Sequence, residues 1–80
     1  MDIIYYYSDS CSSCKDYEKV VDKLSTELKI KAQKRNIKDG MQHQIKGVPT
    51  IILEDDGVIY ESVGNLPYDL LLEDIRKNVE

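Results

Sequence analysis

The sequence lacks several features that would assign it to common classes of protein. It has no tryptophan and no phenylalanine, so its 6 tyrosines are the only aromatic residues (FWY) among 80. No apolar run approaches the roughly 20 residues that a membrane-spanning helix needs. Lysine and arginine number 11 against 15 aspartates and glutamates, whereas nucleic-acid-binding proteins usually carry a basic excess. We therefore expect neither a membrane nor a nucleic acid as partner.

Marks of an exported protein are also missing. The start, Met1-Asp2-Ile3-Ile4, has no basic segment, no long apolar segment and no cleavage site, so it does not resemble a secretory signal. The 2 cysteines, Cys11 and Cys14, form a single Cys-x-x-Cys. A disulfide over so short a loop hardly constrains the unfolded chain, so the pair would contribute little to stability as a structural disulfide. We expect a cytoplasmic protein in which the cysteine pair carries out redox or metal chemistry.

The composition that remains is that of a small globular protein. Hydrophobic residues make up 41% and charged residues 32% of the chain, which argues against wholesale disorder. The length corresponds to one domain over residues 1–80, with a small core.

Apolar patterns in the first half predict a buried strand and an amphipathic helix. Residues Ile3–Tyr7 are apolar on both faces, as in a strand between two layers. A helix is expected from about Ser12 to Leu28, where apolar residues return on one stripe. A second strand is expected within Lys29–Ile37, whose basic residues fit an exposed edge. Asp39–Ile45 is expected to be a short helix or irregular.

The second half predicts a hairpin and a final helix. Two strand patterns, Thr50–Leu53 and Val58–Val63, are separated by a segment that ends in Asp-Gly, a strong hairpin signal. We expect Asn65 to cap the last helix and Pro67 to lie in its first turn, where a missing N–H does no harm. The apolar stripe of this helix comprises Leu71, Ile75 and Val79, widened by Leu70 and Leu72.

The order of these elements is β-α-β-(α)-β-β-α. An opening βαβ unit implies parallel strands, and the hairpin adds two antiparallel ones. We therefore predict an α/β fold with a four-stranded mixed sheet and helices packed on its faces.

The cysteine pair falls at the start of the first predicted helix. Backbone N–H groups there lack internal partners and the helix dipole is positive, so a thiolate at Cys11 is stabilised. Its pKa is expected to fall below the value of about 8.5 for a free cysteine. Cys11 can then attack a target disulfide from solvent. Cys14, one turn further in and better shielded, can attack the mixed disulfide and release the reduced target.

Further motifs follow the cysteines in a particular order. Cys-x-x-Cys-Lys comes after a buried strand, and Gly47-Val48-Pro49-Thr50, an apolar strand, Asp-Gly, Val63-Gly64 and a last helix come later. Cys-x-x-Cys alone is a weak signal, but its combination with the later Pro-Thr is specific. The chain resembles the thioredoxin and glutaredoxin superfamily over essentially its whole length, most closely over Gly47–Lys77.

The resemblance implies a thioredoxin-like fold and a thiol–disulfide oxidoreductase without a cofactor. Cys11 would be the attacking thiol and Cys14 the resolving thiol. Pro49 would follow a cis peptide bond, and the backbone of Val48 would pair with the bound substrate like an added strand. The substrate-binding groove is assigned to Val48, Pro49, Thr50 and Gly64.

Departures from the superfamily pattern refine the expected partners. The chain matches the small glutaredoxin-like redoxins in size, so the implied protein substrate is a ribonucleotide reductase and the protein is expected to be a monomer. Where thioredoxins carry a buried acid, six residues before the first cysteine, this sequence has Tyr5. Glutaredoxins bind glutathione partly through Gly-Gly-Asp after the last strand. Val63-Gly64-Asn65 stands there instead, which favours thioredoxin reductase as electron source.

The same residues also admit interpretations other than thiol–disulfide exchange. A cytosolic Cu(I) carrier could use the same two sulfurs, because soft thiolates suit that ion. A closed zinc site is disfavoured, because such a site needs four ligands and only His43 could join the two cysteines. His43 itself is expected to be a solvated surface residue. Asp9 is a candidate cap of the first helix, and Lys15 could lower the pKa of a nearby thiol.

Overall fold

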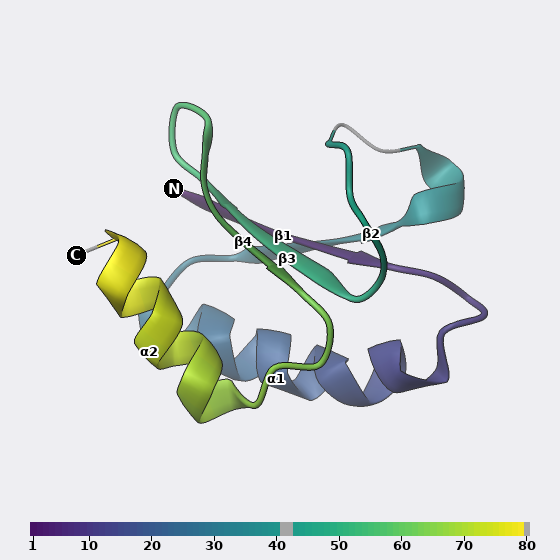
Figure 1. Ribbon diagram of the computed structural model, residues 1–80, viewed down its shortest axis with the longest axis horizontal. Coiled ribbons are helices and arrows are strands. Elements are labelled where there is room, and N and C mark those ends of the chain that lie inside the picture. The colour runs from purple at the N-terminus through teal and green to yellow at the C-terminus, as the bar shows by residue number, and fades with distance from the viewer. Residues whose placement is uncertain (41–42, 80) are drawn as a thin grey trace.

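A mixed sheet with helices against it organises the chain (Figure 1). The computed structural model describes residues 1–40 and 43–79. Some sequence predictions fall outside the described part. They concern Met41, Gln42 and the side chain of Val79. The elements in chain order are β1 (Asp2–Tyr7), α1 (Ser12–Leu28), β2 (Ala32–Asn36), the 3₁₀ helix η1 (Ile37–Asp39), β3 (Thr50–Glu54), β4 (Val58–Val63) and α2 (Tyr68–Val79).

The sheet has the predicted mixture of strand directions. Its four strands lie in the order β2-β1-β3-β4, with β1 parallel to β2 and antiparallel to β3, and with β3 antiparallel to β4. The edge position of β2 agrees with its basic composition, because lysine and arginine discourage pairing with a further strand. The predicted four-stranded α/β fold is therefore confirmed.

Both faces of the central strands are buried, which explains the continuous apolar run of β1. Ile3 and Tyr5 face a core that α1 and α2 cover, whereas Ile4 and Tyr6 pack with Ile52 on the other face. Figure 1 shows both helices beneath the same face of the sheet. On the opposite face, Ile37 and Ile45, which follow β2 in the chain, pack against the smaller cluster. Helices were expected to pack on the faces of the sheet, and both described α-helices lie on the same one.

The start of the last helix differs from the sequence prediction. The amide of Leu71 donates to the carbonyl oxygen of Pro67 at 2.9 Å, and α2 begins at Tyr68. Pro67 therefore occupies the capping position just before the first turn, and Asn65 lies too far upstream to be the cap. Leu71 and Ile75 are buried in the core as predicted.

None of the described helices has the length and apolar character that crossing a membrane would require.

Candidate active site

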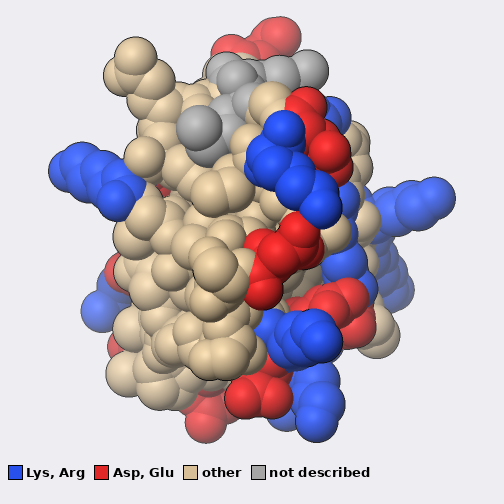
Figure 2. All heavy atoms as spheres, turned by 90° about the vertical axis from the view of Figure 1, so that its right-hand side faces the viewer, with Lys and Arg blue, Asp and Glu red and all other residues tan. Residues whose placement is uncertain are grey.

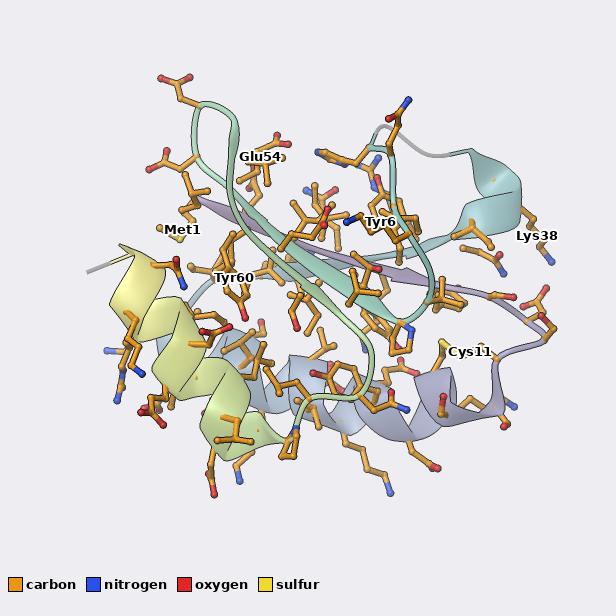
Figure 3. The ribbon with its side chains drawn as sticks, in the orientation of Figure 1. Met1, Tyr6, Cys11, Lys38, Glu54 and Tyr60 are labelled. Carbon is orange, nitrogen blue, oxygen red and sulfur yellow. A yellow bond between two sulfur atoms is a disulfide. The ribbon has the colours of Figure 1, made fainter. Side chains whose placement is uncertain are left out.

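The two cysteines lie at the beginning of α1 and are joined in a disulfide (Figure 3). Their Cα atoms are 5.4 Å apart, within the usual range for bonded cysteines. Cys11 is the residue just before the helix and is half-buried, whereas Cys14 is only 3% exposed. Cys14 is therefore the better shielded of the two sulfurs, as the sequence predicted.

The surroundings of Cys11 favour negative charge on its sulfur. Its backbone is extended, with φ −94° and ψ 98°, so the first turn of α1 starts directly after it. No acidic residue stands in that turn to oppose a thiolate, and the positive end of the helix dipole faces the sulfur. The Ser13 hydroxyl donates toward Cys11 Sγ at 3.4 Å. Ser13 was not among the predicted site residues, although its place inside the Cys-x-x-Cys motif was the available signal.

The predicted substrate-binding residues gather at the same end of the sheet as the cysteines. β1 runs toward Cys11, and Tyr6 near its end pairs with Thr50 at the start of β3. Thr50 pairs in turn with Val63 at the end of β4. The Val48–Pro49 peptide bond is cis, as predicted, and the Gly64 amide donates to the Pro49 carbonyl oxygen at 2.9 Å. Gly64 has φ +98°, a conformation that glycine adopts without strain.

A cavity of about 400 Å³ lies on the other side of the cysteines, between α1 and the strands β1 and β2. Besides both cysteines, its lining includes Tyr5, Glu18 and Lys34. The predicted groove residues are not part of this lining. Seen from the end that carries the cysteines, charged side chains gather mainly on one half of the surface and uncharged residues fill most of the other (Figure 2).

Tyr5 connects this cavity to the inner cysteine. Its hydroxyl donates to the carbonyl oxygen of Cys14 at 2.6 Å. Burial and the nearby negative charge of Glu18 raise the pKa of Tyr5 to about 12. The phenol therefore keeps its proton at neutral pH and acts as a hydrogen-bond donor.

Similarity to known proteins agrees with this geometry. The family model described as Thioredoxin matches residues 1–77. The chain belongs to the thioredoxin family. As a member of this family with a bonded Cys11–Cys14 pair, it is a dithiol–disulfide oxidoreductase, and its substrates are protein disulfides.

Solved structures agree with the thioredoxin fold. Thioredoxin 1 from Thermosipho africanus TCF52B superposes with a TM-score of 0.82 at 21% identity, covering 99% of this chain and 94% of the other. A mutant thioredoxin from Halobacterium salinarum NRC-1 gives a TM-score of 0.78 at 27% identity, covering 98% and 74%. Thioredoxin f2 from Chlamydomonas reinhardtii gives 0.75 at 28%, covering 94% and 75%. A comparison with curated proteins finds no match.

Asp9 does not cap α1, contrary to the sequence prediction. Its carboxylate accepts hydrogen bonds from Lys38 Nζ at 2.6 Å and from Asn36 Nδ2 at 2.8 Å, and α1 has no side-chain cap. The hydrogen bond and the positive charge of Lys38 lower the pKa of the Asp9 carboxyl below its usual value. In this thioredoxin Asp9 therefore anchors the loop before Cys11 to the end of β2.

His43 is also placed differently from its prediction as a solvated residue. Its side chain is only 14% exposed. Its Nδ1 lies 2.9 Å from the hydroxyl of Tyr6, and its Nε2 lies 2.6 Å from Glu54 Oε2. The partners come from β1 and β3, so the fold, rather than the neighbouring glutamines, determines its surroundings.

Metal-ligating side chains do not assemble around the cysteines. Across the described ranges, His, Cys, Asp and Glu side chains form no group of three or more that could hold a metal ion. His43 hydrogen-bonds Tyr6, whose side chain packs in the cluster on the face opposite the helices.

Proposed function

We propose that the chain, as a monomeric single domain over residues 1–80, passes two electrons from its Cys11–Cys14 dithiol to a ribonucleotide reductase in the cytoplasm. The observation that carries this is the pairing of a half-buried Cys11 at a helix start with a buried Cys14 one turn inside. Family membership supports the chemistry, and the small size supports the choice of substrate.

The transfer proceeds in two exchanges. The Cys11 thiolate attacks one sulfur of the target disulfide, so that a mixed disulfide forms and the other target sulfur leaves as a thiolate. Cys14, once deprotonated, attacks Cys11 Sγ, and the second target sulfur leaves. The target is thereby reduced by two electrons and Cys11–Cys14 is oxidised to the disulfide.

Val48, Pro49, Thr50 and Gly64 form the proposed substrate-binding groove. Support comes from the strand pairing that brings the start of β3 and the end of β4 to the cysteine end of the sheet. The backbone of Val48 would pair with an extended segment of the target as an added strand. Gly64 has no side chain to obstruct such a segment.

Thioredoxin reductase is the proposed electron donor, because Val63-Gly64-Asn65 replaces the Gly-Gly-Asp with which glutaredoxins hold glutathione. The geometry gives the alternative, a Cu(I) carrier, no specific support.

A coupled reduction assay tests this function. With NADPH and thioredoxin reductase the protein should reduce insulin, and then a ribonucleotide reductase, faster than with glutathione and glutathione reductase. Cys11→Ser should abolish the activity, because the attacking sulfur is gone. Cys14→Ser should leave the substrate bound to Cys11, a mixed disulfide visible by mass spectrometry. Reduction of insulin at the wild-type rate by Cys11→Ser would contradict the assigned roles.

A further inference from the structure

The resolving step requires Cys14 to lose its proton inside the protein. Only 3% of Cys14 is exposed, and burial away from water disfavours a thiolate. The dipole at the start of α1 acts most strongly on Cys11, which stands before the first turn. A proton acceptor within the adjoining cavity would therefore accelerate the attack of Cys14.

Most titratable groups in the cavity are unsuited to accept this proton. The lining contains the phenols of Tyr5 and Tyr7, the ammonium groups of Lys15 and Lys34, and the carboxylates of Asp9 and Glu18. Phenols and ammonium groups carry their protons at neutral pH. Asp9 stands in the loop before Cys11, and both of its carboxylate oxygens accept hydrogen bonds, Oδ1 from Asn36 and Oδ2 from Lys38.

Glu18 is the remaining carboxylate, and several observations place it close to Cys14. It follows Cys14 by four residues on α1, so both side chains lie on the same face of the helix. Its charge contributes to the raised pKa of Tyr5, whose hydroxyl donates to the Cys14 carbonyl. The Glu18 side chain is 45% exposed, so a proton it accepts can pass to water.

Lys34 holds this carboxylate from across the cavity. Its Nζ lies 2.8 Å from Glu18 Oε1 and 2.9 Å from Asp22 Oδ1. Glu18 and Asp22 thus share one cation. Of these two carboxylates, Glu18 lines the cavity with the cysteines and Asp22 does not.

We propose that Glu18 is the proton acceptor for Cys14, with Lys34 as its positioning residue. The inference rests on the proposed function. As the Cys14 sulfur bonds to Cys11 Sγ, its proton passes to the Glu18 carboxylate, directly or through one water, and the bond between Cys11 and the target sulfur breaks with its electron pair on the target. When the disulfide is reduced again, Glu18 returns a proton to the departing Cys14 thiolate.

Single-turnover reaction with dithiobis-nitrobenzoate separates the two steps. The reduced protein releases one yellow nitrothiobenzoate when Cys11 attacks and a second when Cys14 resolves the mixed disulfide. Glu18→Gln should leave the first phase unchanged and slow the second about tenfold to a hundredfold at neutral pH, in the range of a lost proton acceptor.

Asp22→Asn is the matched control, because it also removes a carboxylate that binds Lys34 but one that does not line the cavity. Its second phase should stay within about twofold of the wild type. An equal second phase in Glu18→Gln and Asp22→Asn overturns the role of Glu18 and leaves the proposed function intact. A wild type without a rapid first phase overturns the proposed function instead.

Discussion

At the residue scale, the hydroxyl of Ser13 lies where it can act on Cys11, the proposed attacking sulfur. In the oxidised form it lies 3.4 Å from Cys11 Sγ, a weak acceptor. After reduction the same hydroxyl can donate to a thiolate, and a charged acceptor forms the stronger bond. Ser13 therefore favours the reactive form of Cys11.

Replacing Ser13 by alanine should slow alkylation of Cys11. At neutral pH the rate with iodoacetamide should fall about fivefold, which corresponds to about 1 kcal/mol for one lost hydrogen bond. Ser12→Ala is the control, because Ser12 is the other residue between the cysteines and is exposed. Equal rates for both variants would remove Ser13 from the site.

Residues whose placement depends on local sequence were predictable, and residues whose surroundings depend on distant partners were not. Cys11 and Cys14 follow from their spacing at a helix start, and the cis bond before Pro49 follows from the family motif. Glu18 meets Lys34 only because β2 returns beside α1, 16 positions later. The partners of His43 likewise come from two strands, β1 and β3. The polar residues beside it in the sequence therefore led to the wrong prediction that it is solvated.

At the scale of elements, the segment of residues 43–49 takes the place of a helical layer. It covers the face of the sheet that carries Ile4, Tyr6 and Ile52, and Ile45 packs there. His43 fixes this segment by joining Tyr6 of β1 to Glu54 of β3. The same segment leads directly to Val48 and Pro49, so its attachment also positions the proposed groove.

Replacing His43 by alanine should loosen this cover. The two lost hydrogen bonds should reduce the free energy of unfolding by about 1–2 kcal/mol, measured by urea denaturation. Gln44→Ala is the control, because Gln44 is exposed on the same segment. A His43→Ala variant as stable as Gln44→Ala would contradict this role of the imidazole.

The extents of the elements were largely predictable, since each follows from local periodicity. β3 and β4 flank the Asp-Gly turn as expected, with Asp56 and Gly57 both at positive φ. The start of α2 was misplaced because both Asn65 and Pro67 favour helix starts, and only the Leu71–Pro67 hydrogen bond decides between them. The placement of both helices on one face depends on packing across the sheet, which periodicity does not contain.

At the scale of the whole molecule, tyrosines replace the missing tryptophan and phenylalanine in the core. Tyr5, Tyr17 and Tyr60 are 1%, 5% and 8% exposed, and each hydroxyl has a hydrogen-bond acceptor. Burial is the main reason why the pKa of each is raised to about 12. The folded state therefore resists ionisation that the unfolded chain undergoes at the ordinary tyrosine pKa of 10.0.

This difference predicts alkaline unfolding. Between pH 10 and pH 12 the unfolded chain loses these protons while the folded protein keeps them, so stability falls as pH rises. Each tyrosine contributes about 2 kcal/mol to the loss, and together they approach the total stability of a small domain. Tyrosinate absorbance and the loss of circular dichroism should therefore rise together below pH 12. Gradual tyrosinate formation with intact dichroism would contradict the prediction.

The long axis of the molecule separates its first residue from its chemistry. Met1 and Cys11 lie toward opposite ends of the molecule in Figure 3, and the longest extent of the molecule is 34 Å. A linker attached at Met1 would hold the protein on an electrode or a resin with the redox pair directed into solution. Immobilised in that orientation, the disulfide would stay open to collision with large proteins.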